Sequence, residues 1–303
     1  MPTWRASVVS ERESSPEISA TGIWSASLRY GDPASAAEAA TELEQLGFGA
    51  IWIPDVGGDV FGAVANLLRA TTHITVATGI LNIWMQAAAD TAEQHARLTA
   101  QHGPRFLVGL GVSHARRIDQ DGPGTYTKPL ERMREYLDAL DAAPTPLQPA
   151  DRVIAALGPK MLELAGSRTA GSHPYLVTPE HTAAVRAALG PDKLVAAEQA
   201  VVLESDPATA RAIARSHLAL YLGLPNYSNN WKRIGFTDDD LEHGGSNRLV
   251  DALVAWGGES EIRSRIDAHR AAGADHVCIQ ALGGERTDHP LDQWRALAPI
   301  VLS

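Results

Sequence analysis

The chain has 303 residues, of which 45% are hydrophobic and 20% charged, a composition typical of a globular protein. Its formal net charge of −10 argues against binding to nucleic acid or to an anionic membrane, because both require a basic face. Cys278 is the single cysteine, which excludes an internal disulfide and a zinc site built from several cysteines, and favours a reducing, cytoplasmic location.

Residues 1–20 form the first segment, and their content of Ser, Glu, Arg and Pro predicts a flexible N-terminal arm. They lack the continuous apolar region of a signal peptide. No stretch of the chain reaches the roughly 18 apolar residues that a membrane span requires. We therefore expect a protein that does not insert into a membrane.

From residue 21 onward, apolar segments typical of strands alternate with segments of helical periodicity. The predicted strands cover 21–30, 48–54, 73–80, 105–111, 151–158, 174–177, 193–204 and 275–282. The predicted helices cover 32–47, 59–70, 90–102, 128–142, 159–168, 178–190, 206–222, 247–257, 260–273 and 290–302.

This alternation predicts an α/β fold. Continuous apolar strands suit a parallel sheet that is covered on both faces. Eight strands, most of them followed by a helix, favour a closed (β/α)8 TIM barrel over an open sheet. We expect one domain over 21–303, with an insertion at about 223–245 after strand seven that forms a lid or a wall of the pocket.

In such a barrel, the chemistry lies on the loops that follow the carboxyl ends of the strands. Gly109 and Gly111 end the predicted fourth strand, and Ser113 and His114 follow them. The glycine pair lacks the third glycine of a dinucleotide-binding fingerprint, because His114 occupies that position. Residues 111–115 miss the G-x-S-x-G turn of hydrolases by one residue, and the sequence behind them does not suggest the required helix. A serine hydrolase acting through Ser113 remains a minor alternative.

His114 itself has two interpretations. A histidine at a strand end can simply cap the local backbone. An imidazole titrates near neutral pH, however, so in a pocket it can also donate a proton to a ligand or accept one from it.

The predicted fifth strand ends at Gly158, Pro159 and Lys160. Glycine lets the backbone approach a ligand closely, and proline suits the first turn of a helix. The free N–H groups of that turn and the helix dipole favour an anion, to which Lys160 adds positive charge. The same pattern also suits an ordinary junction between a loop and a helix.

Asp55 follows the second strand, where it either caps the next helix or accepts a hydrogen bond from a ligand at the barrel mouth. Trp24 and Trp84 are core or wall residues by default, although aromatic side chains near a mouth often line flat cofactors. His173 and His181 match no metal-binding spacing, so we expect no metal site.

Taken together, these strand ends resemble those of the bacterial luciferase-like oxidoreductases, in the branch that uses coenzyme F420, an 8-hydroxy-5-deazaflavin. The resemblance extends from about residue 22 to residue 299 and is carried by the segments 43–55, 74–84, 105–115, 157–166 and 272–282. It implies a (β/α)8 barrel that holds the flat deazaflavin at its C-terminal mouth. It also implies a homodimer that acts on a small molecule.

The resemblance further implies a bulge at the end of strand three, with a cis peptide bond at Gly79–Ile80 behind the cofactor ring. The glycines at 109 and 111 are then expected to thin the rim so that the ring can approach. The implied cofactor-binding residues are Asp55 at the ring, Thr78, Gly79, Ile80 and Asn82 at the bulge, and Gly158, Pro159, Lys160, Met161 and Thr178 around the phosphate.

Two departures from the family pattern limit what can be transferred. Val56 stands where several dehydrogenases of the branch have a proton-transferring histidine, and His114 stands where they have a glutamate. We therefore transfer no substrate from these relatives, and His114 becomes the expected general acid or base. Trp24, Trp84 and Ser113 are expected to line the substrate pocket.

The expected function is a hydride transfer between C5 of the deazaflavin and a small organic substrate. An FMN-dependent monooxygenase on the same barrel is one alternative. A cofactor-binding paralogue without catalysis is another, favoured by Val56.

Overall fold

The computed structural model describes residues 15–120, 122, 124–284 and 287–302. Residues 1–14, most of the expected arm, lie outside this part of the chain. Two later residues of that arm are hydrogen-bonded to the barrel. The Thr75 hydroxyl donates to the carbonyl oxygen of Glu17 at 2.8 Å, and His276 Nδ1 donates to the carbonyl oxygen of Ser19.

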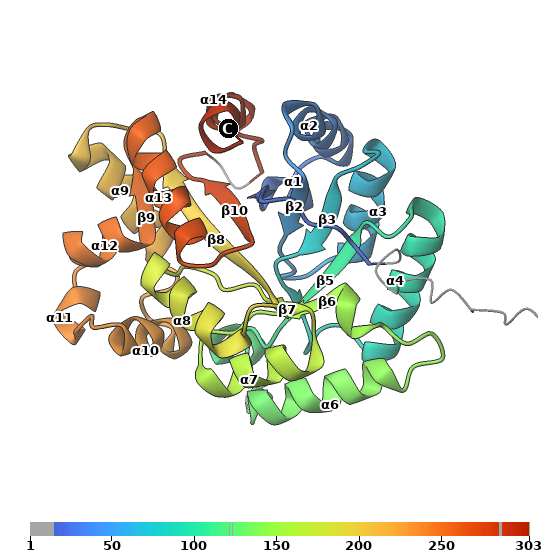
Figure 1. The fold of residues 1–303 in the computed structure, drawn as a ribbon. Coiled ribbons are helices and arrows are strands. Elements are labelled where there is room, and N and C mark those ends of the chain that lie inside the picture. Colours follow the sequence, from blue (N-terminus) through green and yellow to red (C-terminus); the bar gives the residue numbers. More distant parts are fainter. Residues whose placement is uncertain (1–14, 121, 123, 285–286, 303) are drawn as a thin grey trace, which may run out of the picture.

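The strands form a closed parallel barrel (Figure 1). All ten strand pairings are parallel, and β10 pairs with both β1 and β8, which closes the ring. The strands are β1 (Thr21–Trp24), β2 (Ala50–Ile53), β3 (Thr75–Thr78), β4 (Leu81–Asn82), β5 (Phe106–Gly111), β6 (Arg152–Ile154), β7 (Gly171–Ser172), β8 (Leu194–Val202), β9 (Val254–Trp256) and β10 (His276–Ala281). Because β4 continues β3 beyond a bulge, and β9 pairs only with the end of β8, the ring has eight positions. The predicted (β/α)8 fold is confirmed.

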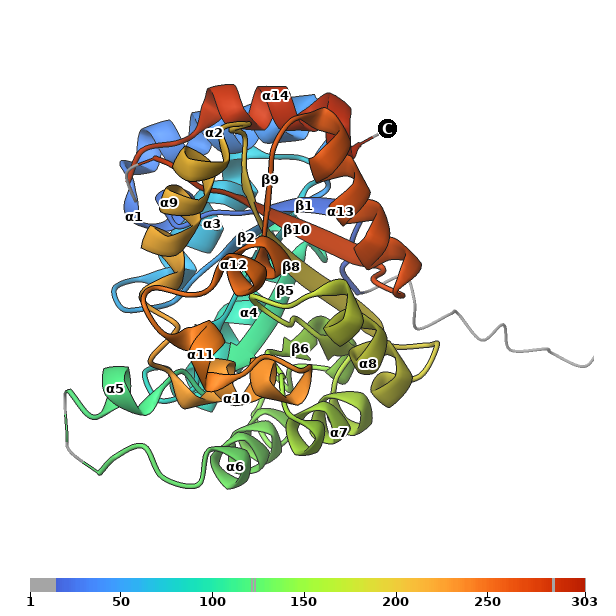
Figure 2. The same cartoon turned by 90° about the vertical axis from the view of Figure 1, so that its left-hand side faces the viewer.

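Helices surround this barrel in both views of the ribbon (Figures 1 and 2). They are α1 (Ser27–Tyr30), α2 (Pro33–Leu46), α3 (Val60–Ala70), α4 (Ala88–His102), α5 (Ala115–Ile118), α6 (Pro129–Asp141), α7 (Pro159–Arg168), α8 (Pro179–Leu189), α9 (Pro207–Leu218), α10 (Pro225–Arg233), α11 (Asp238–Leu241), α12 (Asn247–Leu253), α13 (Glu259–Ala271) and α14 (Leu291–Val301), with a 3-10 turn, η2, at Pro149–Asp151.

The ends of α2 show how local sequence sets these boundaries. The Asp32 carboxylate accepts from the Ser35 N–H, and Pro33 occupies the first turn. Gly47 ends the helix at φ 99°, a left-handed conformation that favours glycine.

The interior of the barrel is filled by side chains below the mouth. Trp52 is fully buried, stacks on His173 with 4.2 Å between ring centroids, and donates from Nε1 to His276 Nε2 at 2.9 Å. These three buried rings fill part of the barrel interior below the mouth.

The strand expected over 21–30 ends at Trp24, and α1 follows it at Ser27–Tyr30. Beyond this, three predicted elements differ from the structure. The sixth strand lies at Gly171–Ser172 rather than at 174–177, because Pro174 has no N–H to donate and Leu176 adopts a left-handed φ of 52°. The helix expected over 247–257 ends at Leu253, and its last residues form β9 instead.

The third difference lies behind His114, where no helix was expected. A single helical turn, α5, begins directly after this residue, and His114 is its N-cap.

Residues 223–245 carry α10 and α11. Trp231 of α10 is fully buried and donates from Nε1 to the carbonyl oxygen of Leu176 at 3.1 Å. This bond holds the segment against the end of the barrel. Figure 2 shows α10 and α11 on the same side of the barrel as α5.

Candidate functional site

One large cavity opens at the C-terminal mouth of the barrel. Its volume is about 1440 Å³, and residues that follow β1, β2, β3, β5, β6, β7, β8 and β10 line it. Ligand pockets usually measure about 300–1,000 Å³. The cavity is therefore large enough for a cofactor and a substrate together.

The structure brings most of the residues singled out in the sequence to this cavity. Those that line it are Trp24, Asp55, Gly79, Ile80, Ser113, His114, Gly158, Pro159, Lys160 and Met161.

Four others lie behind its wall, and each already has a structural partner. The Thr78 hydroxyl donates to the carbonyl oxygen of Gly109, and Asn82 Oδ1 accepts from the Trp84 N–H, whereas the buried Asn82 Nδ2 has no partner. The Trp84 indole donates to the carbonyl oxygen of Val112, on the outer side of the wall. Thr178 is buried as the N-cap of α8, where its hydroxyl accepts from the His181 N–H.

The bulge between β3 and β4 forms one wall of the cavity. Its Gly79–Ile80 peptide bond is cis. Trp24 Nε1 donates to the carbonyl oxygen of Gly79 at 3.0 Å, and a Cβ on Gly79 would lie 2.8 Å from that nitrogen and 3.0 Å from His173 Nε2. Only glycine therefore fits between the two aromatic side chains.

Asp55 supports this bulge. Its Oδ2 accepts from the backbone N–H of Asn82 and from Gln86 Nε2, both at 3.3 Å. It does not cap the next helix, because Asp59 occupies the N-cap position of α3 and accepts from the Gly62 N–H. Asp55 thus ties the end of β2 to the cavity wall.

The two glycines of β5 serve a different purpose from the one expected. A Cβ on Gly109 would lie 2.0 Å from the carbonyl oxygen of Thr78, and one on Gly111 would lie 2.5 Å from the Ile80 side chain. Gly111 lines the cavity, but at both glycines the bulge occupies the direction that a side chain would take. The glycines allow β5 to pack closely against the bulge.

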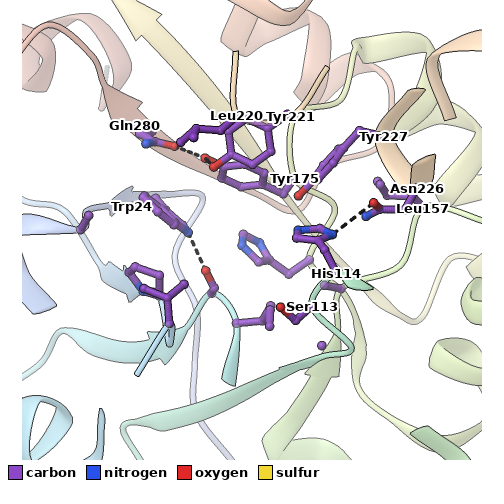
Figure 3. Close-up of a pocket in the computed structure, with 18 of the residues that line it drawn as sticks. Trp24, Ser113, His114, Leu157, Tyr175, Leu220, Tyr221, Asn226, Tyr227 and Gln280 are labelled. Carbon is purple, nitrogen blue, oxygen red and sulfur yellow. Dashed lines mark hydrogen bonds between the residues drawn. The ribbon is translucent and has the colours of Figure 1, made fainter. Parts of the chain in front are cut away.

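His114 extends from the end of β5 into the cavity. Its Nδ1 lies 3.1 Å from Asn226 Oδ1, and the Tyr227 ring lies 5.5 Å away between centroids (Figure 3). Burial lowers the pKa of His114, an effect that the hydrogen bond to Asn226 opposes. At pH 7 the imidazole is therefore predominantly neutral.

Ser113 does not have the arrangement of a hydrolase nucleophile. It adopts φ 55°, and its carbonyl oxygen accepts a 3.4 Å hydrogen bond from the Tyr126 hydroxyl. Among the described residues, no hydrogen bond joins the Ser113 hydroxyl to a histidine, and the adjacent His114 is engaged with Asn226. The geometry gives the serine no base.

The α7 end of the cavity is positively charged. Gly158 is the N-cap of α7 without a side chain to cap the first turn, and Pro159 follows it. Arg233, from α10, lines the same region and donates from Nη1 to the carbonyl oxygen of Leu157 at 3.1 Å. With Lys160, it brings two cations to a helix N-terminus, an arrangement that suits an anionic group.

Two buried groups near Arg233 are without a hydrogen-bond partner. They are Nδ2 of Asn230, whose Oδ1 accepts from Arg233, and Nε2 of His181, whose pKa is lowered to about 4 by burial and by the charge of Arg233. Unsatisfied buried polar atoms are uncommon in proteins. Neither side chain lines the cavity, so both atoms lie in the packing behind Arg233.

A wall of tyrosines bounds another side of the cavity. Figure 3 shows Tyr175, Tyr221 and Tyr227 along one side and Ser113 on the other. The Tyr175 hydroxyl donates to Gln280 Oε1 at 2.7 Å and lies 3.2 Å from the Tyr221 hydroxyl. Burial raises the pKa of Tyr175 and Tyr227 well above the usual value, so both phenols stay neutral.

Sequence reasoning expected the insertion at about 223–245 to form a lid or a wall of the pocket, and Asn226, Tyr227 and Arg233 of that segment do line it. It named none of these residues, and it did not foresee Tyr175 or Tyr221. The three tyrosines come from a loop after β7 and from the segment around α10, which no local motif marks. The one available signal was the insertion after strand seven, whose aromatic and basic residues could have been considered as pocket residues.

Two negative findings concern only the part of the chain that the structure describes. Its His, Cys, Asp and Glu side chains form no group of three or more suited to a metal ion. None of its helices combines the length and apolar character needed to cross a bilayer.

Comparisons with known proteins agree with this geometry. The family model described as luciferase-like monooxygenase matches residues 13–276. A Mycobacterium tuberculosis protein that bears the name of a coenzyme F420-dependent oxidoreductase is 24% identical over 92% of this chain and 97% of its own length. The 5,10-methylenetetrahydromethanopterin reductase of Methanolobus tindarius is 29% identical over 60% of this chain and 66% of its own.

Among solved structures, the coenzyme F420-dependent tetrahydromethanopterin reductase of Methanopyrus kandleri superposes with a TM-score of 0.76. The alignment covers 94% of this chain and 99% of that one at 17% identity, a likeness of fold. With the family model matching most of its length, the chain belongs to the luciferase-like monooxygenase family.

Proposed function

We propose that this protein is a coenzyme F420-dependent oxidoreductase that transfers a hydride between C5 of the deazaflavin and a small organic substrate. One observation carries the proposal: a single cavity joins the bulge wall at Gly79–Ile80, the imidazole of His114 and the cationic N-terminus of α7. Relatives that carry F420 in their names support the choice of cofactor.

The residues present fit such a cofactor, which has a flat ring at one end and an anionic tail at the other. Gly79, Ile80 and Trp24 would hold the ring, and His173 Nε2 beside them is a buried nitrogen without a partner. Gly158, Lys160 and Arg233 would hold the anionic part. When bound, the deazaflavin supplies the hydride chemistry at C5.

The chain supplies proton handling and a shaped, partly dry pocket. We assign His114 as the general acid or base, because it lines the cavity and is neutral near pH 7. The uncharged tyrosine wall and Trp24 would enclose the substrate and restrict water near the reacting carbon. Asp55 would keep the bulge in place rather than exchange protons.

Two alternatives remain on the same site. The family includes monooxygenases, which favours FMN as a second candidate cofactor. A binding protein without catalysis is favoured by Val56, whose exposed side chain lines the cavity at the position where the resemblance implies a proton-transferring histidine.

We also propose that the protein is a homodimer, as the resemblance implies, that it is cytoplasmic, as its single cysteine favours, and that residues 21–303 form one domain, as the regular alternation of strands and helices predicts. Titration of the purified protein with F420 and with FMN, followed by turnover assays over a broad substrate panel, tests the functional proposal. Tight F420 binding with turnover supports it, whereas tight binding without any turnover supports the binding protein.

A further inference from the structure

The hydrogen bond between His114 and Asn226 fixes the position of a proton. Asn226 Oδ1 is an amide oxygen and can only accept, so His114 Nδ1, at 3.1 Å, must carry the hydrogen. A neutral imidazole has one N–H, and the bond made by one nitrogen determines the state of the other. In the neutral ring, Nε2 is therefore a bare acceptor.

Nε2 is also the nitrogen that a ligand can reach. His114 lines the cavity, and its Nδ1 is engaged with Asn226, which leaves Nε2 as the nitrogen for a ligand. The bond to Asn226 holds the ring from its Nδ1 side (Figure 3). A substrate in the cavity thus meets a proton acceptor.

The groups around His114 favour this neutral state. From α10 it faces Asn226 and the ring of Tyr227, a phenol kept neutral by burial. From α5, Arg117 lines the same cavity, and from the loop before α6 the Tyr126 hydroxyl bonds to Ser113. Burial lowers the pKa of His114, and no carboxylate among the described residues opposes this effect.

We propose that Asn226, on the inserted helix α10, is a positioning residue that holds His114 as the Nδ1–H tautomer, so that Nε2 accepts a proton from the O–H or N–H group of a substrate that is being oxidised. This inference rests on the proposed function for the identity of the hydride acceptor. The tautomer itself does not depend on the cofactor.

The step is balanced in atoms and electrons. The substrate C–H bond breaks and its electron pair leaves with the hydrogen as hydride, while the neighbouring O–H or N–H proton moves to Nε2. A C=O or C=N bond forms and the substrate loses two electrons, which the bound oxidised deazaflavin would accept with the hydride. The imidazolium of His114 then releases its proton to water.

Nitrogen-15 NMR of the histidine side chains tests the tautomer without any cofactor or substrate. His114→Gln identifies the His114 signals by their loss. We expect the wild-type protein above its His114 titration to show a protonated Nδ1 and a bare Nε2. In Asn226→Leu, we expect a mixture of tautomers. Asn229→Leu is the same change at another exposed, cavity-lining position of α10, which has no hydrogen bond to His114, and there we expect the wild-type pattern. An Nε2–H tautomer in the wild type, or an unchanged pattern in Asn226→Leu, overturns the proposal.

The pH profile of substrate oxidation gives a second readout. Because the neutral base is the active form, kcat/KM should rise with pH through the His114 pKa and then level off. Asn226→Asp places a carboxylate beside Nδ1, and the rise of kcat/KM should then occur at a pH higher by about 1 unit. Asn226→Leu removes the hydrogen bond that raises the pKa of His114, so the rise of kcat/KM should occur at lower pH. Turnover should also fall by about 10–100-fold.

Shifts in opposite directions are not expected from a purely structural role. If Asn226→Asp and Asn226→Leu show the same dependence of kcat/KM on pH, the positioning role of Asn226 is overturned. If F420 supports no turnover but the NMR pattern is as expected, the proposed function fails while the tautomer assignment stands.

Discussion

Trp24 Nε1 donates a 3.0 Å hydrogen bond to the carbonyl oxygen of Gly79, and this contact joins the end of β1 to the bulge that walls the cavity. The indole can approach because residue 79 has no side chain. Both residues line the cavity. The pair therefore shapes the surface on which we place the cofactor ring.

Gly79→Ala should abolish this contact. The added Cβ would lie 2.8 Å from Trp24 Nε1 and 3.0 Å from His173 Nε2, both atoms of rigid rings. We expect a loss of about 1–3 kcal/mol in the free energy of unfolding and much weaker F420 binding. Gly223→Ala is the matched control, because nothing lies within 4 Å of the new methyl group. Urea unfolding and cofactor titration measure both effects, and wild-type binding by Gly79→Ala would contradict this view of the wall.

Arg233→Gln should weaken cofactor binding by about 10–100-fold, the range expected when a charged hydrogen-bond donor is lost. Lys232→Gln removes the same charge from the adjacent residue, whose ion pair is with Asp238. Titration calorimetry with F420 at low and high salt distinguishes a specific contact of Arg233 from an effect of the general charge of α10. An equal loss in both variants would show that only the general charge of α10 matters.

His114→Gln should leave F420 affinity close to that of the wild type and lower turnover by about 10²–10⁴-fold, the usual contribution of a general acid or base. His73→Gln, at an exposed position before β3, is the control and should keep wild-type turnover. Steady-state kinetics with a substrate found by panel screening provides the measurement. Retained turnover in His114→Gln would remove this residue from the mechanism.

Glu198 predicts a pH dependence of stability. Its carboxyl group is fully buried, with Oε2 accepting from the Leu176 N–H and Oε1 without a partner, and burial raises its pKa from 4.5 to about 8. Between these two values the folded protein holds a proton that the unfolded chain has lost. The contribution of this group to the free energy of unfolding is therefore fully present below pH 4.5. It falls by about 1.4 kcal/mol for each unit that the pH rises, and it is lost above pH 8.

Glu198→Gln mimics the neutral acid and should remove this slope. In urea unfolding from pH 5 to pH 8.5, the free energy of unfolding of the variant should increase relative to that of the wild type, by on the order of 5 kcal/mol at the highest pH. Glu163→Gln, on the exposed face of α7, should follow the wild-type curve. Parallel curves for Glu198→Gln and the wild type would mean that the carboxyl group is ionised without cost.

The sequence allowed the barrel to be predicted because its strands and helices alternate regularly over most of the chain. Gly79, His114 and Gly158 could be placed in one site for the same reason, since the carboxyl ends of parallel strands meet at one mouth. Thr78 and Asn82 were also expected there, but their side chains bond to neighbouring protein groups behind the wall.

The remaining contributors depend on long-range packing. Asn226 and Arg233 reach the cavity only because the buried Trp231 holds α10 against the turn at Leu176. That turn has a left-handed residue whose N–H is taken by Glu198, a contact between segments 22 residues apart. No local motif reports such contacts.

The most direct test of the central claim is a titration of the wild-type protein with F420 and FMN, monitored by fluorescence and calorimetry. We predict one F420 site per chain with micromolar or tighter affinity, much weaker FMN binding, and loss of F420 affinity in Arg233→Gln. Tight FMN binding with little affinity for F420 would contradict the proposal and support the monooxygenase alternative.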